Sequence, residues 1–540
     1  METLVCESKI KSQGIETYGK SATVVSHLDY TTRETNGGLS VFFSILCIVD
    51  LFGVFPVVAL PRSVIACGIY GIPLVLSVFG LQLYTAVLLG RSWLLAQKIT
   101  PKIKEKNRFP YAAVAELAFG RHVRRLVTFL IDTTVFAAGV PNLIVASQSM
   151  QLFWWKVTGG EVGVSYCVWM LIIGFLLCPI MWLGSPKDMK PIALTSTCIV
   201  TVVAVSVWCC ILLDNVSPFS TGLLDYTPRV QDFLVVYGII AFQFDIHPML
   251  LTIQVDMKDS RQINSAVVGG FAVTGFLFAV TSFLAAYRYG RNLNNNILQG
   301  MPPSIPLYLV ALLVTLQLCL SSAVGNSALF QHIEDLLKVP RDFNVQRCIL
   351  RSSFVAVAVF LGETVPRFDL VMGLVGSTLT GPLMFIFPPL FFLKLCYMDS
   401  NIEQKRYDES KSPVDRNGKN GELSKIQDGD CVPLISCDGT DNVYNTFLRD
   451  NVSEIDNKFN IKWYDVILAV IVMLLGMGAT IVATYSSWSD AIASATFSPP
   501  CLLNVTAAAR SFLEAELGHA SLRLIRRRRA HGARGTGHCL

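Results

Sequence analysis

Ala241-Phe-Gln-Phe-Asp-Ile-His-Pro-Met-Leu-Leu251 is an apolar segment interrupted by Asp245, His247 and Pro248. A carboxylate or an imidazole at membrane depth is costly, and a proline there leaves a backbone carbonyl without its helical partner. Of the seven histidines, only His247 is predicted to lie deep inside an apolar segment. An isolated histidine would more often be a hydrogen-bonded core residue. The neighbouring Asp245 and Pro248 favour an ion or proton path instead.

The composition predicts an all-α polytopic membrane protein. The chain has 540 residues, of which 52% are hydrophobic and 15% charged, whereas soluble domains carry about 25% charged residues. The cysteines lie mostly in apolar segments and are predicted to be small core residues rather than a disulfide framework. The polar residues 1–38 contain no apolar core, so we expect no cleavable signal peptide and a cytosolic amino terminus.

Apolar stretches of spanning length predict eleven transmembrane helices. They are 39–66, 72–96, 126–153, 164–183, 191–213, 232–255, 264–287, 305–330, 348–364, 368–397 and 462–487. With the amino terminus inside, the short cytosolic loops hold 16 Lys or Arg residues and the short outer loops hold 5. This bias fits both the number of spans and their orientation.

Three segments are predicted to lie outside the membrane. Residues 1–38 form a disordered cytosolic tail, and the polar residues 398–461 form a disordered cytosolic loop. Residues 488–540 form an outward-facing tail of uncertain order, whose run Arg526–Arg529 is better explained by a tail than by a functional patch. The sequons at Asn215 and Asn504 would face outward, and the sequon at Asn451 inward.

The first predicted span is also broken, in Leu51-Phe-Gly-Val-Phe-Pro-Val-Val-Ala-Leu-Pro-Arg62. Gly53, Pro56 and Pro61 interrupt it, and Pro56 frees the carbonyl of Phe52. Breaks in spans one and six, five helices apart, predict a five-plus-five inverted repeat with the site between the two breaks. The repeats would be about 39–213 and 232–397. Two merely kinked helices are the alternative, since proline is common in membrane spans.

The spacing of Asp245 and His247 predicts the shape of the second break. Residues i and i+2 point apart on an intact helix and share a side in an extended chain. If both side chains line one cavity, residues 244–248 must be unwound, which would expose the carbonyl of Phe244.

Other polar groups in the spans give weaker signals. Asp50 and Asp132 could each be a proton carrier or a buried partner, and Arg62 is expected to snorkel towards the outer surface. The small and polar residues of spans eight and ten are better explained by helix packing than by a site. They are Ser321, Ser322, Gly325, Asn326 and the run Gly373–Ser377.

Several motifs, in this order and spacing, resemble the amino acid/auxin permease family. They are Ala59-Leu-Pro61, Tyr84-Thr-Ala-Val-Leu-Leu-Gly-Arg-Ser-Trp93, Ala115-Glu-Leu-Ala-Phe-Gly120, Phe242-Gln-Phe-Asp-Ile-His247 with Thr252-Ile-Gln-Val-Asp-Met257, and Leu374-Val-Gly376. The family includes vesicular inhibitory, proton-assisted and plant vacuolar amino acid transporters. The resemblance implies eleven helices in a LeuT-like fold and proton- or sodium-coupled amino acid transport. One departure is Val54-Phe55-Pro56, where the family has a glycine-rich stretch.

These observations predict a transporter of small neutral amino acids that works by alternating access. The substrate carboxylate would meet amides at a half-helix amino end, and the ammonium would meet carbonyls of the sixth span. The predicted substrate-binding residues are Val54, Phe55, Val57, Ala59, Phe242, Phe244 and Ser322. His247, tuned by Asp245 and supported by Asp50, would carry the proton.

The expected partners are a small amino acid, protons or sodium, and the lipid bilayer, without nucleic acid, metal or cofactor. The membrane would be the plasma membrane or a lysosomal or vesicular membrane. A channel would need a ring of like groups, and an enzyme would need further catalytic residues at one membrane surface. An amino acid sensor with little or no turnover remains the alternative function.

Overall fold

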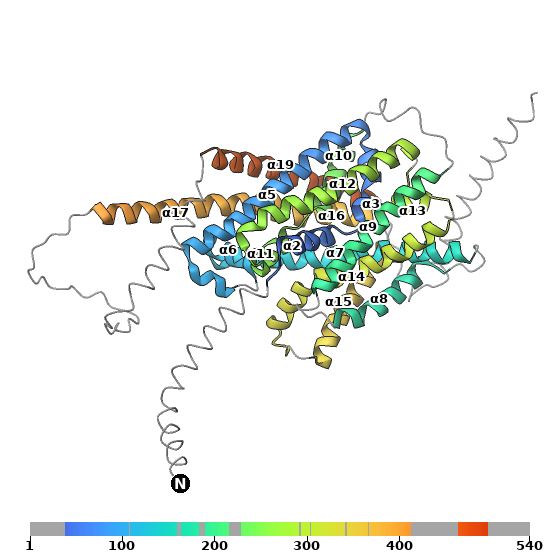
Figure 1. Ribbon diagram of the computed structural model, residues 1–540, viewed down its shortest axis with the longest axis horizontal. Coiled ribbons are helices and arrows are strands. Elements are labelled where there is room, and N and C mark those ends of the chain that lie inside the picture. The colour runs from blue at the N-terminus through green and yellow to red at the C-terminus, as the bar shows by residue number, and fades with distance from the viewer. Residues whose placement is uncertain are drawn as a thin grey trace, which may run out of the picture.

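A computed structural model describes ten stretches of the chain, and all regular structure in them is helical apart from one isolated bridge (Figure 1). The described residues are 38–106, 109–158, 164–182, 189–214, 228–290, 293–302, 304–340, 343–365, 367–411 and 463–494. The predicted tail 1–38 and the three sequons fall outside them, except for Gly38.

The bundle is built from long apolar helices and several short ones. They are α2 (Val41–Phe52), α3 (Phe55–Val58), α4 (Leu60–Ala66), α5 (Gly71–Ile99), α6 (Pro110–Phe119), α7 (Arg121–Val157), α8 (Tyr166–Trp182), α9 (Met189–Leu213), α10 (Val230–Gln243), α11 (His247–Asp256), α12 (Ile263–Tyr289), α13 (Ile297–Gly300), α14 (Ile305–Leu336), α15 (Val345–Thr364), α16 (Phe368–Val375), the π-helical η6 (Gly376–Thr380) and η7 (Pro382–Ile386), α17 (Phe387–Lys411) and α19 (Trp463–Ser494).

Within the described stretches, nine helical segments are long and apolar enough to cross a membrane. Each overlaps one of the expected spans. The other two expected spans, the first and the fourth, correspond to the shorter apolar helices Val41–Phe52 and Tyr166–Trp182. The protein is therefore a multi-pass integral membrane protein.

The first broken helix follows the prediction from its glycine and prolines. α2 ends at Phe52, and Gly53 takes a φ of +61°, a conformation that a side chain would disfavour. Pro56 lies in the first turn of α3, where its missing N–H costs nothing. Pro56 has no N–H to donate to the carbonyl of Phe52. This carbonyl instead accepts a hydrogen bond of 2.7 Å from Gln243 Nε2.

The second break is shorter than predicted. α10 ends at Gln243 and α11 begins at His247, so only residues 244–246 are unwound rather than 244–248. Pro248 occupies the second position of α11, which tolerates proline because its N–H would have no helical acceptor. The two breaks lie against each other, with the rings of Phe52 and Phe244 5.5 Å apart.

Close backbone packing joins α10 to the tenth span, as predicted for the run that begins at Gly373. A Cβ at Gly376 would overlap the carbonyl oxygen of Gly238, and a Cβ at Gly238 would lie 2.5 Å from the carbonyl oxygen of Gly373. Beyond this contact the tenth span passes through η6 and η7, whose wider turns often occur at functional sites. Thr484 on α19 donates to the carbonyl of Ser377 at 3.0 Å.

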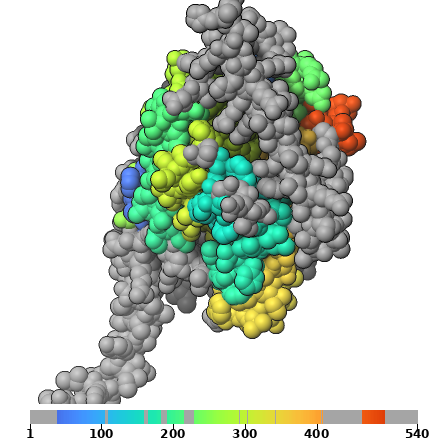
Figure 2. Space-filling model, turned by 90° about the vertical axis from the view of Figure 1, so that its right-hand side faces the viewer, coloured from blue at the N-terminus to red at the C-terminus, as the bar shows by residue number. Residues whose placement is uncertain are grey.

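A buried ion pair ties α14 to α15 and α8. The Arg351 side chain is 1% exposed; its Nε donates to Glu334 Oε1 at 2.7 Å and its Nη1 to the carbonyl of Met181 at 2.5 Å. Removing one partner of such a pair leaves an uncompensated buried charge. α8 and α15 lie side by side at the surface shown in Figure 2, in teal and yellow.

Two predicted segment boundaries are wrong. α17 continues through Lys411, so the first residues of the supposed disordered loop 398–461 are helical, and α17 projects beyond the bundle in Figure 1. Lys98 Nζ holds this extension through Asp399 at 3.0 Å and Glu403 at 2.8 Å. α19 likewise continues to Ser494, into the predicted outer tail 488–540. Residues 412–461 and 495–540 lie outside the described stretches.

Candidate functional site

A central cavity of about 110 Å³ lies where the two broken helices meet. Both breaks, α7, α14 and η6 contribute to it. Its lining residues are Leu51, Phe52, Phe55, Thr134, Val135, Ala138, Gly139, Asn142, Phe242, Gln243, Asp245, Pro248, Met249, Ser321, Ser322, Gly325, Asn326 and Thr380. Ten of these residues are apolar and eight are polar, so the cavity combines apolar walls with convergent polar groups, as a small-molecule site does.

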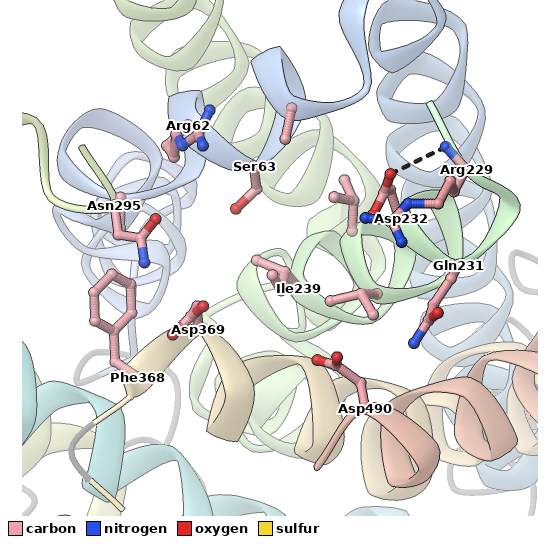
Figure 3. A pocket seen from close by; sticks show the side chains of 14 residues that line it. Arg62, Ser63, Arg229, Gln231, Asp232, Ile239, Asn295, Phe368, Asp369 and Asp490 are labelled. Carbon is pink, nitrogen blue, oxygen red and sulfur yellow. Dashed lines mark hydrogen bonds between the residues drawn. The ribbon is translucent and has the colours of Figure 1, made fainter. Parts of the chain in front are cut away.

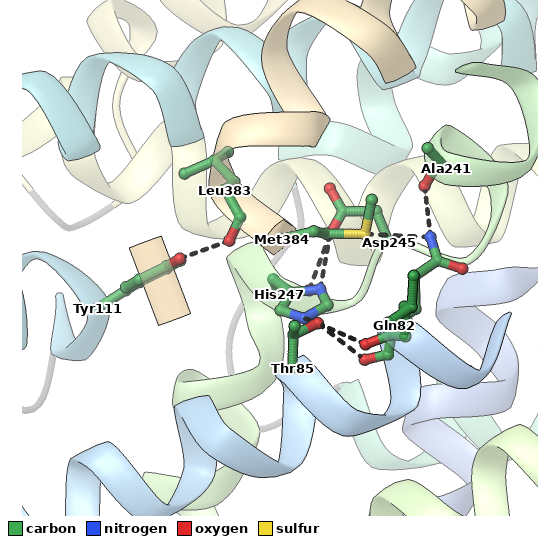
Figure 4. A network of polar contacts seen from close by, with 9 residues as sticks. Gln82, Thr85, Tyr111, Ala241, Asp245, His247, Leu383 and Met384 are labelled. Carbon is green, nitrogen blue, oxygen red and sulfur yellow. Dashed lines mark hydrogen bonds and ion pairs between the residues drawn. The ribbon is translucent and has the colours of Figure 1, made fainter. Parts of the chain in front are cut away.

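Asp245 and His247 form a buried pair whose side chains contact each other (Figure 4). His247 Nδ1 lies 3.2 Å from Asp245 Oδ1, and the backbone N–H of His247 donates to the same oxygen at 3.0 Å. His247 Nε2 lies 3.1 Å from Thr85 Oγ1 on α5. Asp245 lines the cavity and the fully buried His247 does not. The two side chains therefore do not line one cavity in this conformation, because the helix resumes at His247.

We expect cysteines introduced singly in this region to react with a thiol reagent only where the position lines the central cavity. Cysteines at Asp245 and Met249, which line the cavity, should react with a small polar thiol reagent, and a bound substrate should protect both. A cysteine at His247 should stay unreactive, because the position is buried against Thr85. Equal reaction at Asp245 and His247 would instead indicate an unwound stretch that extends through His247.

The other predicted substrate-binding residues divide into three groups. Phe55, Phe242 and Ser322 line the central cavity. Ala59 instead lines a separate, larger cavity of about 280 Å³. Val54, Val57 and Phe244 are buried and belong to the lining of neither.

The predicted carboxylate cradle in the first span is mostly closed. The amides of Val57 and Val58 both donate to the carbonyl of Val54, and the amide of Ala59 donates to that of Phe55. Pro56 has no N–H. Few amides of this stretch are left for a ligand in this conformation.

Asp50 lies beside the cavity rather than in its lining. It is fully buried, and neither carboxylate oxygen receives a hydrogen bond of good geometry from a described residue. The Ser196 hydroxyl lies near the carboxylate, and Gln317 Nε2 donates to Ser196 at 3.3 Å. An isolated buried carboxylate is costly, and a bound proton or cation removes the cost. Asp50 therefore fits the predicted role in coupling.

A second histidine–carboxylate pair joins α14 to α7. α14 extends to Leu336, beyond the expected span 305–330, and brings His332 Nδ1 to 2.5 Å from Asp132 Oδ2 on α7. From the sequence, Asp132 could be a proton carrier or a buried partner of another group. In the structure it is paired with His332. The sequence signal for this pair is that the eighth helix can continue beyond its apolar part into polar residues.

The larger outer cavity has a volume of about 280 Å³ and is lined by both signs of charge (Figure 3). Arg62, Arg229, Asp369 and Asp490 all face it. Arg62 therefore lines a cavity rather than snorkelling to the surface as predicted. The outer cavity shares no lining residue with the central cavity.

A smaller cavity of about 40 Å³ lies on the other side of the central one, nearer the start of α7. It shares Val135, Pro248 and Met249 with the central cavity. Asp132 also lines it. The three cavities thus follow one another along the broken helices.

No cluster of three or more potential metal ligands occurs in the part of the chain that the structure describes.

Two broken helices around a central cavity, inside a bundle of apolar helices, are typical of a membrane carrier. Residues 8–412 match the family described as transmembrane amino acid transporter protein. The chain belongs to this family, whose members are carriers and not enzymes.

Similar proteins agree with this assignment. Amino acid transporter AVT1H of Arabidopsis thaliana is 23% identical over 63% of this chain and 78% of its own length. Vacuolar amino acid transporter 3 of Schizosaccharomyces pombe is 24% identical over 34% of this chain and 29% of its own length. The crystal structure of MhsT in complex with L-phenylalanine matches 84% of this chain and 99% of that chain, with a TM-score of 0.50 and 10% identity. At this identity the likeness shows the LeuT-like fold alone.

Proposed function

We propose that the protein is a secondary active transporter that moves small neutral amino acids by alternating access, coupled to protons. The observation that carries this proposal is the central cavity between two broken helices, with one cavity on either side of it. Alternating access requires a central site that opens in turn to each side of the membrane.

The proposed architecture has eleven spans and two inverted repeats. It is supported by the breaks after Phe52 and Gln243, which interrupt the first and sixth of the expected spans. A backbone pairing joins the two broken helices at one end, where the Leu39 amide donates to the carbonyl of Asp256 at 2.7 Å. This pairing favours movement of α2 and α11 as one unit.

The size and the lining of the cavity support a small neutral substrate. About 110 Å³ admits a small ligand, and the apolar part of the lining, which includes Leu51, Phe55 and Val135, suits an uncharged side chain. Coupling is assigned to His247, Asp245 and Asp50, which are buried ionisable groups at the two breaks. Such groups in a membrane interior usually mark ion or proton paths.

The proposed orientation places the amino terminus in the cytosol, and the vacuolar relative favours a vesicular membrane. Cys167, at the start of the fourth expected span, is disulfide-bonded, and the other cysteines that the structure describes form no disulfide. Disulfides persist in oxidising compartments, which supports an outward-facing start of α8.

An epitope inserted between residues 412 and 461 should therefore be reached by antibody only from the cytosolic side. In sealed vesicles of known orientation, Asn504 should be glycosylated and Asn451 should not. Detection of the epitope from the outer side would invert the proposed topology.

The proposed function is tested by uptake into proteoliposomes against a panel of amino acids, with and without an imposed pH gradient. Uptake of small neutral amino acids that grows with the gradient is the expected result. Uptake that depends only on sodium would overturn proton coupling while leaving amino acid transport intact. Binding without flux would favour the second candidate, an amino acid sensor, which the same cavity could serve.

A further inference from the structure

We propose that Asp245 is shared by two cations, the His247 imidazolium on Oδ1 and the ammonium group of the ligand on Oδ2, so that ligand binding expels the proton. The inference rests on the proposed function and adds the sign of the coupling: proton and amino acid exchange rather than travel together.

Unused acceptor atoms in the central cavity point to a cationic ligand group. Asp245 Oδ2 and Gln243 Oε1 are buried and without hydrogen-bond partners among the described residues, as is the Thr380 hydroxyl. Gln243 Nε2 donates to the Phe52 carbonyl, which fixes Oε1 as the free end of that amide. An unsatisfied buried acceptor costs about 1–3 kcal/mol, and an ammonium group with three N–H donors would remove that cost.

The side-chain amide donors of the cavity are already engaged. Asn142 Nδ2 donates to Ser322 Oγ at 3.0 Å, and Asn326 Nδ2 donates to the Ser322 carbonyl at 2.9 Å. Asp245, whose side chain is 5% exposed, is the sole ionisable residue in the described lining. The cavity therefore offers one carboxylate and no cation to a ligand.

The two oxygens of Asp245 face different neighbours. Oδ1 contacts the His247 ring, which lies outside the lining, and the side chain also lines the cavity. Two cations on one carboxylate attract it separately and repel each other, so each weakens the binding of the other. By thermodynamic linkage, a ligand that binds more tightly to neutral His247 must release its proton.

No other charge near His247 disturbs this balance among the described elements packed on α11. α5 offers Thr85 and η7 offers Met384, neither of which titrates near neutral pH. Tyr111 of α6 donates to the Leu383 carbonyl, and Asp132 of α7 is paired with His332. Arg261, in the turn after α11, is exposed.

The experiment measures the protons exchanged when an amino acid binds to the purified, full-length protein in detergent. The twenty standard L-amino acids are ranked by thermal stabilisation, and the best is titrated calorimetrically in two buffers of different ionisation enthalpy. We expect net proton release on binding, and an affinity that rises with pH by up to about tenfold per pH unit. The N-acetyl derivative, which lacks the ammonium, should not bind, and the methyl ester should bind.

Two variants separate the roles. His247→Asn should bind the ligand without releasing a proton and without pH dependence, whereas Asp245→Asn should lose about tenfold or more in affinity. If Asp245→Asn cannot be purified, Asp245→Glu and the N-acetyl derivative test the same contact.

Proton uptake on binding, or equal binding of the N-acetyl derivative, would overturn the shared carboxylate while leaving the proposed transporter intact. Absence of binding by all twenty amino acids would overturn the proposed function, and the inference with it.

Discussion

Replacing His247 by Asn is expected to abolish amino acid accumulation driven by a pH gradient, with a loss of about tenfold or more in initial rate. Asn keeps a hydrogen-bonding group near Asp245 Oδ1 but cannot take up a proton, so the conformational change loses its link to the gradient. The measurement is uptake of the preferred amino acid into proteoliposomes with and without the gradient.

Exchange of labelled for unlabelled substrate at equal pH provides the control for that variant. It should persist in His247→Asn, because His247 does not line the cavity. Normal gradient-driven accumulation by the variant would remove His247 from the coupling mechanism.

Replacing Gly376 by Ala is expected to destabilise the folded protein strongly. A Cβ at this position would overlap the carbonyl oxygen of Gly238, and both backbones belong to packed helices that cannot yield separately. Overpacking of this kind costs about 3 kcal/mol or more, a large share of the 5–15 kcal/mol that typically stabilises a protein. We expect little monodisperse protein on gel filtration after membrane extraction.

Gly478→Ala on α19 is the matched control, because a Cβ there meets no atom within 4 Å. This variant should be recovered like the wild type. Recovery of Gly376→Ala at the same level would mean that α10 and the tenth span do not pack through their glycines.

The membrane class and both helix breaks could be predicted from the sequence because their causes are local. Gly53 and Pro56 end α2 by backbone geometry alone, and Pro248 limits where α11 can begin. The freed Phe52 carbonyl was also predictable from Pro56. Its partner, Gln243, was not, since it comes from a helix 191 residues away.

The direction of side chains at the site could not be predicted in this way. Resumption of the helix at His247 turns the imidazole towards Thr85, and no local pattern marks that residue as the start. The pairing of Asp132 with His332 depends on how far α14 extends and on its packing against α7. Arg62 faces a cavity because α10 and the tenth span meet there. These are properties of tertiary packing.

Counterflow is the most direct measurement of the central claim, that the two broken helices form a carrier for amino acids. Proteoliposomes loaded with an unlabelled small neutral amino acid are diluted into a trace of the labelled one, at equal pH on both sides. We predict a transient accumulation of label above equilibrium, which only a site exposed alternately to each side produces. Binding of the amino acid without any accumulation over protein-free liposomes would contradict this account.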